Sequence, residues 1–205
     1  DKRTSHIATL DWIGSNNAKE EEVDQFSARV DETEDHFTLS NGKLKVTISK
    51  HSGAIISIKD LAASTEFLDI KNGKNKLGAN QFVLFDDKPL SWQAWDTELY
   101  SVLQFKYLQV IEKVAIIRNS HSECAIEVVI KVSGECSIKS TISLKATTFE
   151  SQNTSKVDIS TLVRNWDARN KFLKVEFPVN VRSEYASYET QFGITRRPTV
   201  YNTSW

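Results

Sequence analysis

The sequence predicts an all-β protein, an antiparallel β-sandwich, and three observations lead to that fold class. Apolar residues alternate with polar ones at a period of two from about residue 36 onward. β-branched residues dominate the alternating segments, and no segment shows a long helical period. The 7 glycines and 3 prolines are few, so the turns must depend on Asn, Asp and Ser. Short strands in close succession indicate two packed antiparallel sheets.

Residues 1–35 differ from the rest of the chain. Residues 18–35 hold eight acidic side chains against Lys19 and Arg29. Such a run is usually solvated, so we expect 1–35 to be an acidic linker or edge segment. Residues 36–205 then form the sandwich domain. Because the chain begins without Met and stops at Trp205 with no polar tail, we expect a fragment of a larger protein, truncated at its C-terminus.

The first strands are the clearest. Asn41-Gly42 separates two alternating stretches, which predicts a hairpin, and a turn at 51–53 adds a third strand. Residues 36–60 are therefore predicted to form a three-stranded meander. The residues expected to point inward here are Leu44, Val46, Ile48, Ile56 and Ile58.

Further strands are predicted at short spacing. They are Gln81 to Phe85, a pair within Val102 to Arg118, a hairpin of Cys124 to Val132 with Cys136 to Leu144, then Val157 to Val163, Phe172 to Phe177 and Tyr188 to Ile194. In the hairpin we expect Ile126, Val128 and Ile130 to point inward. Simple hairpin pairing does not place Cys124 opposite Cys136, so two buried, unpaired thiols are expected rather than a disulfide.

Several function classes lack a signal. A net charge of -1 gives no global field for nucleic acid, and no apolar run approaches the roughly 18–20 residues of a membrane span. The chain has no Gly-x-Ser-x-Gly motif and no glycine-rich phosphate loop. The four histidines are scattered, so we expect surface histidines, no metal site and no catalytic residue in this chain. The glycosylation tripeptides at Asn153 and Asn202 are weak signals of secretion.

One stretch, residues 77–96, has the chemistry of a sugar site. It places amides, carboxylates and two tryptophans around an apolar strand and a Pro-bearing loop. Amide and carboxylate groups hydrogen-bond hydroxyls, while an aromatic ring stacks on the apolar face of a sugar. The substrate-binding candidates are Asn80, Gln81, Asp86, Asp87 and Trp95. The competing interpretation is that Trp92 and Trp95 plug the sandwich edge and the Asp residues cap turns.

Two long stretches resemble the cytosolic and vacuolar α-mannosidases of glycoside hydrolase family 38. The first runs from Asn80 to Pro89 and continues with Trp92-Gln93-Ala94-Trp95-Asp96. The second begins Phe177-Pro178-Val179-Asn180-Val181-Arg182-Ser183 and runs through Tyr188-Glu189-Thr190-Gln191-Phe192-Gly193 and Arg197-Pro198-Thr199 to Asn202-Thr203-Ser204-Trp205. The order and spacing of the strand pattern fit this family across about residues 36–205. The turn-rich composition, with many Asn, Lys and Ser residues, is similar to that of a yeast vacuolar enzyme.

The resemblance implies the β portion of a retaining, zinc-dependent exo-α-mannosidase, with a supersandwich of the galactose-mutarotase-like kind. It implies that the nucleophile, the acid/base carboxylate and the zinc cluster belong to an N-terminal domain that is absent here, so the fragment alone is expected to be inert. The partners it implies are the remaining domains of the parent enzyme and an α-mannoside oligosaccharide, in a vacuolar or cytoplasmic homo-oligomer. The alternative function is a stand-alone carbohydrate-binding or protein-interaction sandwich.

The resemblance also implies a role for one residue after Gly78-Ala79. In related enzymes the strand that begins Gly-Ala sends a side chain into the sugar subsite, and here that position is Asn80, with Gln81 beside it. Because a strand exposes alternate side chains, only one of the two is expected to reach the pocket. The competing interpretation is that both satisfy loop backbone.

Overall fold

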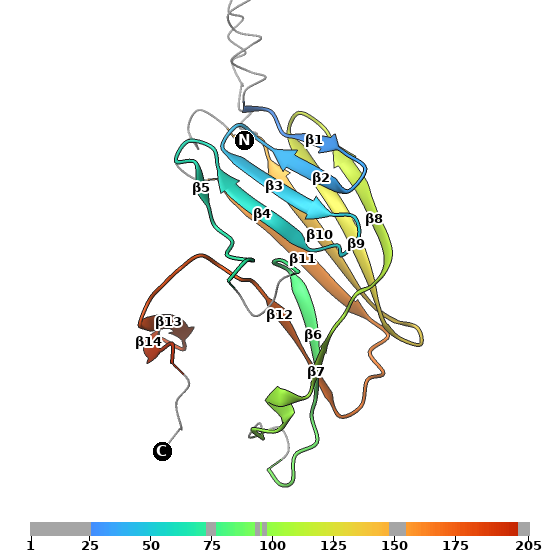
Figure 1. The fold of residues 1–205 in the computed structure, drawn as a ribbon, viewed down its shortest axis with the longest axis vertical. Helices are drawn as coiled ribbons and strands as arrows, with labels where there is room; N and C mark the ends of the chain where they lie inside the picture. The colour runs from blue at the N-terminus through green and yellow to red at the C-terminus, as the bar shows by residue number, and fades with distance from the viewer. Residues whose placement is uncertain (1–25, 73–76, 93–94, 96–97, 148–154, 201–205) are drawn as a thin grey trace, which may run out of the picture.

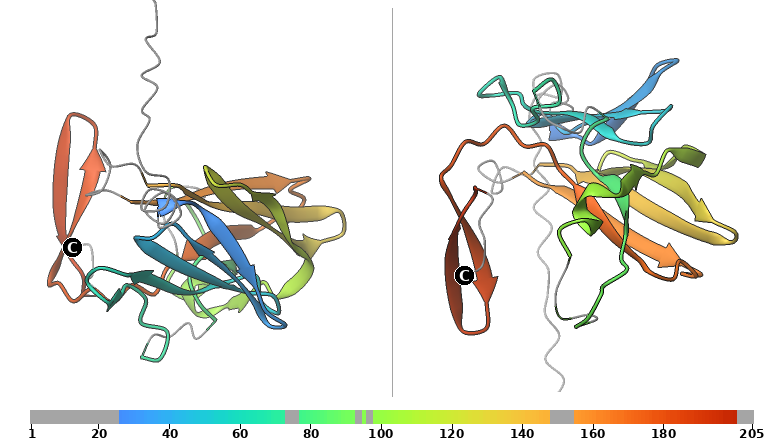
Figure 2. Two further views of the ribbon diagram at one scale, coloured as in Figure 1. Left: turned by 90° about the horizontal axis from the view of Figure 1, so that it is seen from above. Right: turned by 60° about the horizontal axis from the view of Figure 1, so that its bottom comes forward.

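The regular structure is almost entirely β-strand in the computed structural model, which describes residues 26–72, 77–92, 95, 98–147 and 155–200 (Figure 1). The described residues form antiparallel sheets of five, four, three and two strands, with one short 3-10 helix, η1 (Ser101–Leu103). The two larger sheets face each other as two layers (Figure 2). The predicted all-β, antiparallel fold class is confirmed.

The five-stranded sheet is a meander in chain order. Its strands are β1 (Arg29–Glu32), β2 (His36–Ser40), β3 (Leu44–Ser49), β4 (Ile55–Asp60) and β5 (Thr65–Glu66). The Asn41-Gly42 turn forms as predicted: Gly42 has a φ of 77°, and the Asn41 side-chain oxygen accepts hydrogen bonds from the backbone N–H groups of Lys43 and Leu44. Part of the acidic segment, Arg29–Glu32, is edge strand β1, while residues 18–25 lie outside the described residues.

The prediction that Ile56 points inward is wrong. A β-bulge shifts the register between β3 and β4, so Thr47 lies opposite Ser57 but Ile48 lies opposite Ile55. Because a bulge inserts one extra residue, it exchanges the faces on which neighbouring side chains lie. Ile55 is therefore fully buried, and Ile56 is only half-buried.

The four-stranded sheet contains the predicted hairpin. Its strands are β11 (Val157–Arg164), β10 (Cys136–Lys145), β9 (Glu123–Ser133) and β8 (Val110–Asn119), in that order. Cys124 lies opposite Leu144, and Cys136 lies opposite Ser133 across the turn. Both thiols are free and buried, as predicted, and burial raises the pKa of Cys124 to about 11.

The core lies between these two sheets. β1 contacts β8 and β9, while β2 contacts β9 and β10. The predicted inward residues Leu44, Val46, Ile48, Ile126, Val128 and Ile130 all belong to one buried cluster, and Ile58 packs against it. Phe82 and Leu84 join the same cluster from the next sheet.

The three-stranded sheet has the order β12 (Lys171–Glu176), β6 (Gln81–Asp86) and β7 (Phe105–Tyr107). The pair predicted within 102–118 exists as two strands, but they do not pair with each other: β7 joins β6, and β8 joins β9. Leu108, buried between β7 and β8, donates its backbone N–H to the carbonyl of Phe82 at 3.0 Å. That bond holds the chain where it passes from one sheet to the other.

The last two strands form a separate hairpin, β13 (Tyr185–Thr190) with β14 (Gly193–Pro198). The single strand predicted over 188–194 is therefore wrong, because that stretch contains the turn, where Phe192 has a φ of 60°. The hairpin stands to one side of the two large sheets in both views (Figure 2). The chain reaches it through residues 177–180, whose Val179 forms an isolated bridge with Leu68.

Candidate functional site

Strand β6 positions the predicted site residues, and it separates them into two groups. Asn80 and Gln81 stand at its amino end, while Asp86 and Asp87 stand at its carboxyl end. A strand rises about 3.3 Å per residue, so Gln81 and Asp86 are roughly 17 Å apart along the backbone. The structure therefore does not bring the five candidates into one site.

The amino end of β6 starts from a tight approach to β4. Gly78 has a φ of 134°, and a Cβ at this position would collide with the backbone carbonyl of Ile55. Ala79 and Ile55 exchange backbone hydrogen bonds at 2.8 and 2.9 Å. Only glycine fits such a position readily, so the Gly-Ala pair has a structural reason of its own.

Asn80 and Gln81 are both buried, with 3% and 1% of their surfaces exposed. Asn80 has a φ of 57°, a left-handed conformation that Asn tolerates better than most residues. The Gln81 amide donates to the carbonyl of Leu108 at 2.9 Å and to that of Phe82 at 3.4 Å. Gln81 thus satisfies backbone in this chain, and contact of either residue with a sugar stays a prediction.

The carboxyl end of β6 borders a small open hollow of about 270 Å³. The Asp86 carboxylate forms an ion pair with Lys171 and lies 4.0 Å from the Lys88 ammonium group. The hydrogen bond from Lys171 is the main reason that the pKa of Asp86 is lowered, with further Coulombic contributions from the nearby lysines. The hollow is lined by Leu84, Asp86, Gln104, Phe105, Lys106 and Lys171.

Asp87 and Trp95 belong to the loop after β6. Asp87 donates its backbone N–H to the carbonyl of Asn170 at 2.8 Å, and Trp95 donates its own to the carbonyl of Trp92 at 2.9 Å. The side chains of Trp92 and Trp95 are 74% and 86% exposed. The interpretation that these tryptophans plug the sandwich edge is therefore wrong for this chain, because neither is buried against a sheet.

Sequence reasoning missed most of the hollow's lining. Lys171 on β12 lies opposite Asp86 of β6, and Lys106 on β7 lies opposite Leu84 of β6. The register between strands therefore brings these lining residues together. On the other face of β6, Phe85 stacks on Phe172 with ring centroids 4.8 Å apart. No local motif marks these residues, although the two predicted strands that carry them were visible in the sequence.

The hollow offers hydrogen-bond donors and acceptors. Lysine and amide groups donate, and the amide oxygen and the carboxylate accept, so a hydroxyl-rich ligand matches this chemistry. Its volume of about 270 Å³ is slightly below the range of about 300–1,000 Å³ that is usual for ligand pockets. Asp86 is the one carboxylate among its lining residues, and that carboxylate is already paired with Lys171.

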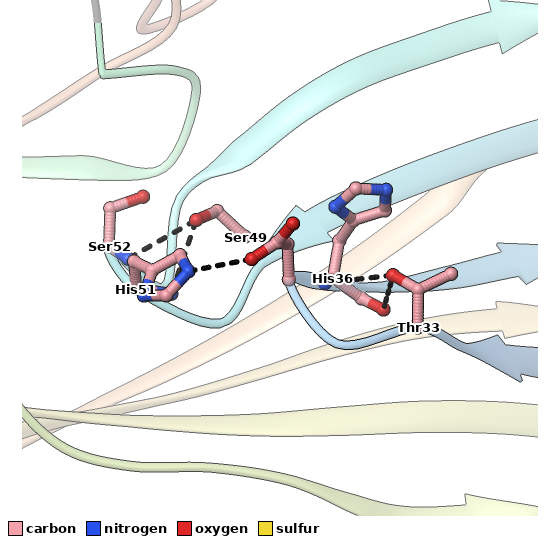
Figure 3. Close-up of polar contacts among 6 residues, drawn as sticks. Thr33, His36, Ser49, His51 and Ser52 are labelled. Atoms are coloured by element: carbon pink, nitrogen blue, oxygen red, sulfur yellow. Dashed lines mark hydrogen bonds and ion pairs between the residues drawn. The ribbon is translucent and has the colours of Figure 1, made fainter.

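Two of the described histidines lie beside turns of the five-stranded sheet, since His36 begins β2 and His51 follows β3, while His121 lies in the turn between β8 and β9 of the four-stranded sheet. In the turn before β2, Thr33 bonds the backbone of His36, and in the turn after β3 the Ser49 hydroxyl accepts from the backbone N–H groups of His51 and Ser52 (Figure 3). The His51 ring lies 3.0 Å from the Asp35 carboxylate, and this hydrogen bond lowers the pKa of Asp35. These contacts join two neighbouring turns, while His6 lies outside the described residues.

A second charged group is buried away from the hollow. Glu127 on β9 pairs with Lys139 on β10 and with Lys113 on β8, the latter at 3.0 Å. Hydrogen bonds first from Lys139 and then from Lys113 lower the pKa of Glu127. The arrangement spans three strands and is a cross-strand contact of the sheet rather than a reactive group.

The described ranges hold no group of three or more His, Cys, Asp and Glu side chains placed to bind a metal ion. They also hold no helix of the length and apolarity that a membrane crossing requires.

Comparison with known proteins gives consistent matches. The sequence model of the family described as "Glycosyl hydrolases family 38 C-terminal domain" matches residues 39–205. The chain is 57% identical over 201 residues to "Alpha-mannosidase" of Saccharomyces cerevisiae, which covers 97% of this chain and 19% of that protein. It is 35% identical over 177 residues to "Alpha-mannosidase 2C1" of Homo sapiens, covering 86% of this chain and 16% of the relative. It is also 35% identical over 171 residues to "Alpha-mannosidase G" of Dictyostelium discoideum, covering 81% of this chain and 14% of that relative. The chain thus spans less than a fifth of the length of these curated relatives.

Proposed function

Because this chain belongs to glycosyl hydrolases family 38, whose C-terminal domain it matches, we propose that it is the β-sandwich portion of a retaining exo-α-mannosidase. The substrates proposed for the complete enzyme are terminal α-mannosides of free oligosaccharides and N-glycans. The observation that carries the proposal is the match of nearly the whole chain to a relative named alpha-mannosidase.

The chemistry of the proposed enzyme lies outside this chain. A retaining glycosidase uses two carboxyl groups about 5–5.5 Å apart across the scissile bond. The hollow beside β6 is lined by a single carboxylate, Asp86, which Lys171 neutralises. The described residues hold no cluster that fits zinc. As the family resemblance implies, we assign the zinc and the catalytic carboxylates to an N-terminal domain outside residues 1–205.

The chain's part is to scaffold the enzyme and to line its sugar site in part. Asp86 and Asp87 lie at the carboxyl end of β6, where Asp86 lines the open hollow, and Trp95 is exposed in the loop that follows. Asn80 and Gln81 are proposed contacts only for the assembled enzyme, since both are buried here. The proposed environment of the parent is the vacuole or cytoplasm, and its proposed state is a homo-oligomer.

The surface beyond β6 supports the existence of partner domains. The loop and the short helix between β6 and β7 carry large apolar side chains that are exposed, and apolar surface of this kind marks an interaction site. These side chains are Leu90, Trp92, Trp95, Leu99 and Leu103. We assign them to contact with the remaining domains of the parent enzyme.

An aryl α-mannoside assay tests the proposal. The full-length enzyme should release mannose, contain zinc by elemental analysis and lose activity with a chelator that zinc reverses. The 205-residue chain should show neither turnover nor stoichiometric zinc. Chelator-sensitive turnover by the 205-residue chain, free of full-length enzyme, would place a catalytic site within it and overturn this division of roles.

A stand-alone carbohydrate-binding or interaction module is the alternative, favoured by the exposure of Trp92 and Trp95. Titration of the 205-residue chain with methyl α-mannoside, monitored by calorimetry, distinguishes the binding module from the enzyme portion. Saturable binding that Trp95→Ala abolishes would favour the module. Absence of binding, together with activity of the full-length protein, would favour the enzyme.

A further inference from the structure

The edges of the sheets are protected in different ways. An exposed edge strand presents unpaired N–H and C=O groups, and proteins block such edges with short strands, charges or bulges. Among the described residues, β5 and β7 are only two and three residues long. Edge strand β1 has three charged residues out of four, and β8 carries two bulges, near Ile111 and Ile116.

Strand β11 is neither short nor bulged. It pairs with β10 over eight consecutive residues, from Val157 opposite Leu144 to Arg164 opposite Ser137, without a break in register. It contains no proline and no lysine, and its charges, Asp158 and Arg164, stand near its ends. Five uncharged residues, 159–163, therefore form a regular edge, with which no described strand other than β10 pairs.

The side chains of β11 are also incompletely covered. Ile159 lies opposite Ile142 and packs against the core, which places alternate residues such as Val163 on the same inner face. Yet Val163 is 39% exposed, while its partner Ile138 on β10 is fully buried. Leu162, on the outer face, is 50% exposed. Apolar side chains are thus open to solvent on both faces of the strand.

We propose that β11 is an internal strand of the complete protein, paired along its free edge with a further β-strand from outside residues 1–205. The inference rests on the proposed function, which makes this chain part of a longer polypeptide. More than four-fifths of the length of the matched yeast relative lies beyond the matched region, so ample chain exists to supply the strand. The added strand presents apolar side chains toward the core, next to Val163, and its backbone completes the ladder.

The occupant is a strand of the same polypeptide rather than a second copy of this edge. A tethered strand is presented at a high effective concentration, so it fills an open edge before another molecule does. The unbulged register of β11 suits such permanent pairing, whereas the bulged edge of β8 does not.

Residue-resolved hydrogen exchange on the full-length protein tests this inference. Only alternate N–H groups of an edge strand face its one neighbour, so a free β11 leaves about half of its amides unprotected. We expect all amides of 159–163 to be protected in the full-length protein, and alternate ones to exchange at least about tenfold faster in the 205-residue chain. Fast exchange of every second amide in the full-length protein would overturn the proposal.

Proline substitutions give a second, independent measurement. In Thr161→Pro and Leu162→Pro, the lost N–H groups point toward opposite edges of β11. The variant whose lost N–H group points away from β10 should leave the thermal midpoint of the 205-residue chain nearly unchanged. The same variant should lower the midpoint of the full-length protein by several degrees. Thr161→Ala is the matched control, because it removes the 3.1 Å contact between the Thr161 and Ser140 hydroxyls without blocking the backbone.

The outcomes separate this inference from the proposed function. Mannosidase activity with an unprotected β11 would refute the added strand and leave the function intact. A protected β11 in a full-length protein without mannosidase activity would refute the function alone. Protection that appears in the 205-residue chain only as its concentration rises would identify a second copy as the occupant, contrary to the proposal.

Discussion

Gln81 offers the sharpest test of the site, because sugar contact and structural support predict different results. The structure buries its amide and directs it to the carbonyl of Leu108, at the point where the chain leaves β7 for β8. Gln81→Met keeps most of the volume but removes the donor. Gln81→Ala removes the donor and leaves a cavity.

The magnitudes follow from these contacts. An unsatisfied buried carbonyl costs about 1–3 kcal/mol, and the cavity in the Ala variant adds about 1–2 kcal/mol. For a chain of this size, each kcal/mol lowers the thermal midpoint by about 2–4 °C. Gln81→Met should therefore lower the midpoint of the 205-residue chain by about 2–12 °C, and Gln81→Ala by about 4–20 °C.

Gln81→Glu gives a test with a defined direction in pH. A buried carboxylate facing a carbonyl has a raised pKa, so the protonated form, which can donate, is favoured in the folded state. Stability of this variant relative to wild type should rise as the pH falls from 7 toward about 4.

Thermal scans of the 205-residue chain and kinetics of the full-length enzyme form the assay. The structural role predicts loss of stability in proportion to the lost contact, with catalytic efficiency retained by the folded fraction. If Gln81→Met keeps the wild-type midpoint while the catalytic efficiency of the full-length enzyme falls about 10–100-fold, the reasoning from burial is refuted. Gln81 would then be the sugar contact that the family resemblance implies.

Three further predictions concern other parts of the molecule. Glu127→Gln should destabilise the chain by about 1–2 kcal/mol at pH 7, measured by urea unfolding. The lowered pKa of Glu127 means that its contribution is present above the ordinary value of 4.5 and is lost as pH falls further, so the gap to wild type should shrink toward pH 3. Gly78→Ala should cost about 3 kcal/mol or more, because the new Cβ meets the backbone of β4; a near-native midpoint would show that this approach can relax. Replacing both Trp92 and Trp95 with Ala should leave the unfolding midpoint of the 205-residue chain within about 2 °C of wild type but weaken domain docking in the full-length enzyme, seen as faster limited proteolysis.

The sequence determined the parts of the fold that depend on local pattern. Alternation around Asn41-Gly42 predicted the meander, and the stretch from Cys124 to Leu144 predicted the long hairpin with two unpaired cysteines. Binary pattern and turn chemistry suffice there, because strand neighbours in the chain are also neighbours in the sheet. The same local pattern misassigned Ile56, since a bulge leaves no clear trace in an alternating sequence.

Tertiary structure alone decided the rest. β7 and β8 are adjacent in the chain yet belong to different sheets, and Lys171 reaches Asp86 from 85 residues away. The sequence placed five candidates within sixteen residues, from Asn80 to Trp95, but the extended backbone of β6 holds Asn80 and Gln81 at one end of a strand and Asp86 and Asp87 at the other. Residues that are close in sequence lie far apart when the backbone between them is an extended strand. The register between strands also brings together residues that no local motif connects. For that reason family membership could be recognised from the residues, while the burial of Gln81 and the open edge of β11 required the fold.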